Sequence, residues 1–170
     1  MTAASVTHPE TRMTEWIKHG LIGGLVAGIA FAIFEMIMAV VLDGAAAFFM
    51  PLRMIGAMAL GEQALDPAYS LPTAAATGIG VHLILSMLYG VAVAGAARYV
   101  PALAGSAASL VAWASAAGLG LWLVNFYVFA PAFGWTWFPQ ATNPIVQAIA
   151  HTVFYGTILG IYLNLAARRA

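Results

Sequence analysis

The chain has 170 residues, of which 63% are hydrophobic and only 7% are charged, and its mean hydropathy is +0.93. Soluble domains carry about a quarter charged residues, so this composition excludes an ordinary soluble protein and predicts an integral membrane protein. The net charge is zero and the basic residues form no cluster, which excludes a nucleic-acid partner. Because cysteine is absent, any metal or haem would need histidine, carboxylate or methionine ligands.

Four apolar segments organise the chain. Polar residues fill positions 1–15, which we expect to form a disordered cytoplasmic tail, and positions 16–170 are expected to form one transmembrane domain. Each apolar segment has at least the roughly 20 residues that a helix needs to cross a bilayer. The first is longer than a signal-peptide core of about 7 to 15 residues, so we expect it to be retained. The predicted spans are 16–42, 73–97, 106–130 and 143–167.

The connection between the first two spans is long enough to contain a helix of its own. Pro51 suits the first turn of a helix and Gly61 suits its end. A helix of about ten residues is too short to cross the membrane, so we expect a short interfacial or re-entrant helix with Arg53 at headgroup level. The predicted fold class is therefore all-α, an integral membrane four-helix up-down bundle with a short interfacial helix between spans 1 and 2.

The flanking residues predict the orientation. Trp135, Trp137 and Phe138 precede the last span and are typical of an aromatic belt at the membrane interface. With four spans, most basic residues fall on the side of the two termini, whereas Arg53 falls on the other side. The positive-inside rule therefore predicts that both termini are cytoplasmic. The residues on the terminal side are Arg12, Lys18, Arg98, Arg168 and Arg169.

Each predicted span carries one polar side chain at a similar depth. These residues are Glu35, His82, Asn125 and His151, each roughly 9 to 15 Å from the outer end of its helix. Small residues lie on the same stripe of the first span as Glu35, so we expect that stripe to face protein. In an up-down bundle the second and fourth spans are diagonal, which would bring His82 and His151 to opposite sides of the axis.

The two halves of the chain look alike, which suggests tandem duplication of a two-helix hairpin. Ser86 and Tyr155 each follow a histidine by four residues.

An ionisable side chain inside a membrane segment is costly unless it is paired, and it therefore marks a functional-site hypothesis. His82, His151 and Glu35 would form a two-histidine, one-carboxylate site for a first-row transition metal. Alternatively, the two histidines would ligate the iron of haem b, with glycines leaving room for the macrocycle. Those glycines are Gly78, Gly90 and Gly156. The surrounding polar residues would be Asn125, Ser86, Tyr155 and Gln147.

Two other functions stay open. Glu35 and the histidines could exchange protons in a small proton or solute transporter. Alternatively, the polar residues could only hold helices together in a non-catalytic accessory or scaffold subunit. The sequence has no serine nucleophile, phosphate loop or paired carboxylates, so it favours binding over catalysis. The expected partners are the lipid bilayer and a homo-oligomer or larger membrane complex.

Four stretches together resemble a family of small, uncharacterised bacterial four-span inner-membrane proteins. They are PLRMIGAMALG, HLILSMLYG, NFYVFAP and AHTVFYG, and the resemblance extends from Trp16 to the end of the chain. It implies a four-span fold and a location in the bacterial inner (cytoplasmic) membrane. It assigns no functional residue, because such a family has no established chemistry.

Overall fold

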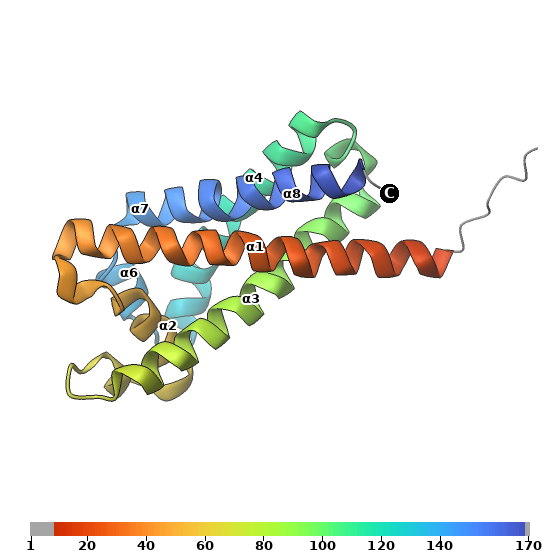
Figure 1. Cartoon of the computed structure of the whole chain (residues 1–170). Coiled ribbons are helices and arrows are strands. Elements are labelled where there is room, and N and C mark those ends of the chain that lie inside the picture. The colour runs from red at the N-terminus through yellow and green to blue at the C-terminus, as the bar shows by residue number, and fades with distance from the viewer. Residues whose placement is uncertain (1–8, 169–170) are drawn as a thin grey trace, which may run out of the picture.

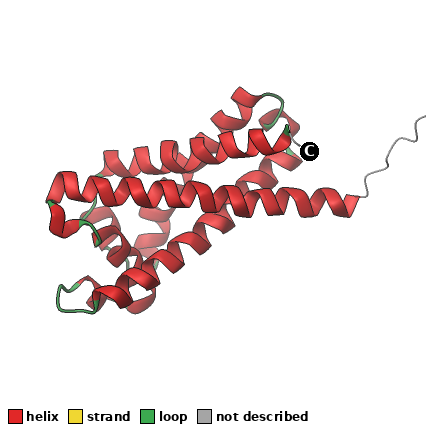
Figure 2. Ribbon diagram, in the orientation of Figure 1, coloured by secondary structure: helices red, strands yellow, loops and turns green. Residues whose placement is uncertain are grey.

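The protein is an integral membrane protein built from helices. The computed structural model describes residues 9–168, and this part of the chain contains no strand (Figure 2). Four of its helical segments are long and apolar enough to cross a membrane, so the predicted all-α, four-span fold is confirmed. These segments are Thr14–Asp43, Leu71–Tyr99, Ala107–Ala132 and Pro144–Ala167. Residues 1–8 of the predicted tail lie outside the described residues, and the helix already begins at Pro9.

The connections are short helices and turns, including the predicted helix between spans 1 and 2. The elements in chain order are α1 (Pro9–Asp43), η1 (Ala45–Ala47), α2 (Met50–Leu60), η2 (Glu62–Leu65), α3 (Leu71–Tyr99), η3 (Pro101–Leu103), α4 (Ala107–Val124), η4 (Asn125–Phe129), α5 (Ala130–Ala132), α6 (Trp137–Gln140), α7 (Pro144–Ile149), η5 (Ala150–Thr157) and α8 (Ile158–Ala167). Segments η4 and η5 are π-helical.

Local sequence sets the helix ends. Pro51 lies in the first turn of α2, and Gly61 follows its last residue with a φ of 86°, which a residue with a side chain rarely adopts. The Ser106 side chain accepts a hydrogen bond from the backbone N–H of Ser109 at the start of α4. Asn143 caps α7 in the same way by accepting from two backbone N–H groups. These ends therefore follow from residues close to them in the sequence.

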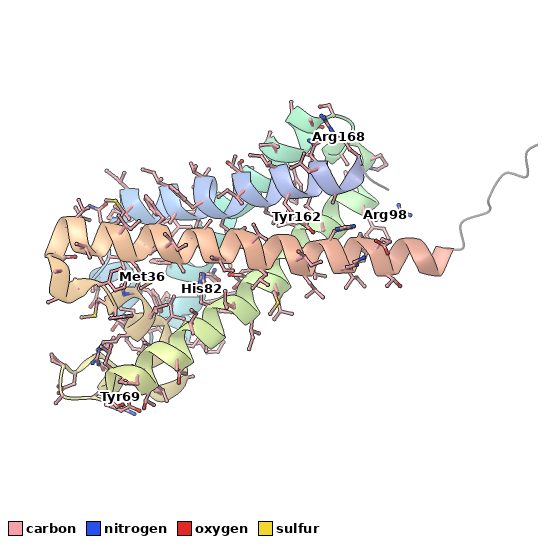
Figure 3. All side chains as sticks on the ribbon, in the orientation of Figure 1. Met36, Tyr69, His82, Arg98, Tyr162 and Arg168 are labelled. Atoms are coloured by element: carbon pink, nitrogen blue, oxygen red, sulfur yellow. The ribbon has the colours of Figure 1, made fainter. Side chains whose placement is uncertain are left out.

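The four spans pack in a ring. Helix α1 lies between α3 and the continuous span formed by α7, η5 and α8, and that span also packs against α4 (Figure 1). Spans two and four therefore occupy diagonal positions, as predicted for an up-down bundle. Both ends of the described chain lie at one end of the bundle, where Figure 3 also places Arg98 and Arg168.

Glycines allow the helices to approach closely. A Cβ atom added at Gly24 would lie 2.3 Å from the carbonyl oxygen of Ser86, and one at Gly90 would lie 2.2 Å from that of Gly20. The predicted small-residue face of the first span therefore contacts protein. Gly78 and Gly156 are equally close to neighbouring backbone, so the room expected for a haem macrocycle beside these glycines is filled by other helices.

At the opposite end of the bundle the helices diverge. Helix α3 runs away from α1 toward its N-terminal end, and α2 packs against it there (Figure 1). Gly78 of α3 lies against the backbone of α2, where an added Cβ would be 1.9 Å from the Leu52 carbonyl oxygen. The indole Nε1 of Trp137 in α6 donates to the Met54 carbonyl oxygen at 3.1 Å. Helices α2 and α6 therefore contact each other at this end of the bundle.

The structure defines the surroundings of Arg53, whereas its predicted position at headgroup level stays a prediction. Its side chain is buried, with 8% of its surface exposed. Its guanidinium group donates to the carbonyl oxygens of Ala64, Asp66 and Tyr69 at 2.9, 2.9 and 3.0 Å. An arginine presents five N–H donors in a planar fork, so one side chain can satisfy several carbonyls. The guanidinium group of Arg53 therefore binds the backbone of the loop after α2.

Candidate functional site

A cavity of about 370 Å³ lies at the diverging end of the bundle. Pockets for small molecules typically measure about 300 to 1,000 Å³, so this one has room for a small organic ligand. It extends along α1 from Phe31 to Asp43. All seven polar residues that the sequence singled out line it, namely Glu35, His82, Ser86, Asn125, Gln147, His151 and Tyr155.

Glu35 is the buried acid of this cavity. Its side chain is 8% exposed, and its Oε2 accepts a hydrogen bond of 2.7 Å from Nε2 of Gln147. Its other oxygen, Oε1, is buried and has no hydrogen-bond partner among the described residues. A buried polar atom without a partner costs about 1 to 3 kcal/mol. Glu35 therefore lines the cavity and keeps one carboxylate oxygen that no described residue pairs.

The two histidines are fixed by backbone carbonyl groups. His82 bonds through Nε2 to the carbonyl oxygen of Gly28 at 2.8 Å, and His151 bonds through Nδ1 to that of Gln147 at 2.9 Å. A carbonyl can only accept, so the N–H group of each neutral ring lies at the bonded nitrogen. The second nitrogen, Nδ1 of His82 and Nε2 of His151, is then a free acceptor. Figure 3 shows His82 between α1 and α3.

A phenylalanine contacts both histidines. The Phe31 ring centroid lies 5.1 Å from that of His82 and 4.7 Å from that of His151. The Phe126 ring also meets His151 edge to face at 5.7 Å. Sequence reasoning missed Phe31, although it lies one helical turn before Glu35 on the same face of α1.

Hydrogen bonds between spans hold the remaining polar residues. The Tyr155 hydroxyl donates to the Ser86 carbonyl oxygen at 2.6 Å, and the Tyr89 hydroxyl donates to Oδ1 of Asn125 at 2.8 Å. Tyr89 was also missed, although it follows His82 by seven residues and therefore lies on the same helical stripe. These bonds join α3 to η5 and to η4 across the cavity.

The two π-helical segments lie beside the cavity. Asn125 opens η4, and His151 and Tyr155 belong to η5. A π-helical turn inserts an extra residue into a helix, and such turns occur frequently at functional sites. No sequence signal predicted them.

Most of the remaining wall is aromatic or apolar. It includes Phe31, Phe126, Phe129, Phe133, Trp135 and Phe138. The aromatic residues of the predicted interfacial belt therefore divide into two groups. Trp135 and Phe138 line the cavity, whereas Trp137 is buried against α2.

The donors do not form a compact metal centre. In the described part of the chain, no group of three or more His, Asp or Glu side chains is placed to hold a metal ion. His82, His151 and Glu35 line the same cavity without forming such a group. A bound transition metal or haem therefore stays a prediction.

The fold and the cavity define the class of this protein as a four-span integral membrane protein with a polar and aromatic pocket inside the bundle. Comparisons with protein-family models, with curated proteins and with solved structures found no match. The resemblance to bacterial four-span inner-membrane proteins therefore stays a prediction.

Proposed function

We propose that this membrane protein binds a small, largely apolar organic molecule in the cavity beside Glu35. The observation that carries the proposal is a cavity lined by Glu35, a buried acid whose Oε1 atom lacks a partner among the described residues. A ligand with a hydrogen-bond donor would remove the cost of leaving that oxygen unpaired. The aromatic wall would cover the apolar body of the ligand.

A transition metal is the second candidate. Each histidine keeps one free nitrogen while the other is bonded to a carbonyl oxygen, and metal-binding histidines are commonly held in this way. The organic ligand ranks first because the described residues offer no group of three His, Asp or Glu donors. Elemental analysis of purified protein, together with an absorption spectrum, tests this second candidate. A stoichiometric metal or a haem spectrum would favour it over the organic ligand.

A variant that fills the cavity tests the first candidate. Ala39 lines the cavity, whereas Ile37 on the same helix is 52% exposed and does not line it. We expect Ala39→Trp to abolish the thermal stabilisation that fragment-sized aromatic molecules give to the purified wild-type protein. The matched control, Ile37→Trp, should retain it. If no fragment stabilises the wild type, or if both variants respond like the wild type, the proposed pocket function is wrong.

The remaining functions predict other results. A proton or solute transporter predicts flux in proteoliposomes that Glu35→Gln removes. An accessory subunit predicts that the protein purifies with a larger membrane complex. We also propose the bacterial inner membrane as the location, which the resemblance of the sequence implies. Both termini are placed in the cytoplasm on the basis of the basic residues at the terminal end.

A further inference from the structure

We infer that the ligand of this cavity is an organic ammonium ion with an aromatic or aliphatic body, and that Glu35 is its counter-ion. This inference rests on the proposed binding function and adds the chemical class of the ligand.

The charges of the wall are acidic. The cavity is lined by Glu35 and Asp43 of α1, and none of the described residues that line it is Lys or Arg. Arg53 is the nearest basic residue along α2, but its guanidinium group donates to three carbonyl oxygens of the following loop. A ligand cation would therefore meet carboxylates without competing with a protein cation.

The wall offers acceptor atoms that no described residue uses. Oε1 of Glu35 is buried without a partner in the described structure, and each neutral histidine ring has one nitrogen free to accept. A primary ammonium group has three N–H donors and no acceptor. An anion or a carbonyl compound would leave Glu35 Oε1 unpaired, and a single hydroxyl group would satisfy fewer acceptors.

The aromatic rings favour a positive charge as well. The faces of Phe and Trp rings carry negative charge density and attract cations within about 6 Å. Phe31 contacts both histidine rings, and Phe126, Phe129 and Trp135 also line the cavity. The same rings can cover the apolar part of an arylalkyl amine. Charge, donors and apolar body thus indicate one class of ligand.

Two probes of nearly equal shape test the inference. 2-Phenylethylamine is protonated at neutral pH, as alkylamines generally are, whereas 2-phenylethanol is neutral. Their affinities for the full-length protein in detergent can be measured by isothermal titration calorimetry. We expect the amine to bind the wild type at least about tenfold more tightly than the alcohol, since hydrogen bonds to charged groups are the stronger ones.

Glu35→Gln keeps the shape of the side chain and removes its charge. We expect this variant to lower the ratio of the two affinities to about one, chiefly by weakening amine binding. Asp43→Asn, at the outer end of α1, should change the ratio less because that residue is exposed. The wild-type comparison decides the matter even if Glu35→Gln does not fold.

The outcomes separate this inference from the proposed function. If both probes bind the wild type equally and Ala39→Trp abolishes both, the pocket function stands and the ammonium inference is wrong. An amine preference that Glu35→Gln leaves unchanged also overturns it, because another group would then supply the charge. If neither probe binds and no other fragment does, both proposals fail.

Discussion

The two ends of the helical bundle are packed by different means. At the end with both termini, glycines bring backbones together: Gly20 meets Gly90, and a Cβ at Gly160 would lie 2.8 Å from the Cα of Val111. At the other end, α2 and α6 pack against the spans and a cavity of about 370 Å³ lies within the bundle. In Figure 3 the labels Arg98 and Arg168 mark the first end of the bundle, and the label Tyr69 marks the second.

This difference shows how one short helix changes a transmembrane bundle. Small residues alone would draw the four spans together along their whole length. Helix α2 contacts Gly78 of α3 instead, so the glycine contact there joins α3 to α2 and not to another span. The space that this arrangement leaves among the spans is lined by polar groups that bond between helices, as in the pairs Glu35 with Gln147 and Tyr155 with Ser86. The cavity therefore lies where α2 packs against α3, whereas glycines pack the spans closely at the end with both termini.

The largest effect that we predict concerns which end faces the cytoplasm. The chain contains no cysteine, so a single cysteine can be placed at either end without background. We expect a membrane-impermeant maleimide to label Ala68→Cys in intact cells and to label Ala167→Cys only after the membrane is permeabilised. Both positions are exposed. The reverse pattern would place the cavity end in the cytoplasm.

Arg53 tests what holds the cavity end together. Arg53→Ala leaves the carbonyl oxygens of Ala64, Asp66 and Tyr69 without their shared donor, and we expect a loss of about 3 kcal/mol. Thermal unfolding and proteolysis within the loop after α2 measure the effect. The control Arg98→Ala removes an exposed charge at the other end and should change stability by about 0.5 kcal/mol or less. Equal losses in the two variants would show that the three buried hydrogen bonds of Arg53 stabilise the protein no more than an exposed charge does.

Gly90 tests the close packing of the other end. In Gly90→Ala the new Cβ would lie 2.2 Å from the Gly20 carbonyl oxygen, so α1 and α3 must separate. We expect a loss of about 1 to 3 kcal/mol in thermal unfolding, as for other overpacked sites. In Gly80→Ala, on the same helix, the new Cβ would have no atom within 4 Å. This variant should instead be stabilised by about 0.5 to 1 kcal/mol, because alanine has a higher helix propensity than glycine. A gain in both variants would contradict the close contact.

The smallest effect concerns a single hydrogen bond beside the cavity. Tyr155→Phe removes the donor to the Ser86 carbonyl oxygen, which is 2.6 Å away. We expect a loss of about 0.6 to 1.7 kcal/mol, which spans the average and the largest value for hydrogen bonds between transmembrane helices in double-mutant cycles. Unfolding in detergent measures it, with Tyr99→Phe as the exposed control. A change no larger than that of the control would exclude this bond as a link between α3 and η5.

Much of the fold and the membership of the site could be predicted, because both follow from local patterns. Glu35, His82, Asn125 and His151 could be predicted to lie at one level of the bundle from their distance to the helix ends, since each residue advances a helix by about 1.5 Å. The pairing of side chains could not be predicted in this way. Gln147 reaches Glu35 across 112 positions of sequence, and His82 reaches Gly28 across 54. Such pairs depend on the rotation of each helix about its own axis.

The sequence by itself determined the four spans, the short helix after Pro51 and the buried face of α3, because hydropathy and helical periodicity act over a few turns. Only the tertiary structure decided that Phe31 contacts both histidines and that the Arg53 side chain donates hydrogen bonds to the loop after α2. It also decided that Oε1 of Glu35 lacks a partner among the described residues. These features depend on contacts between segments that are far apart in the sequence, which no pattern within one helix records.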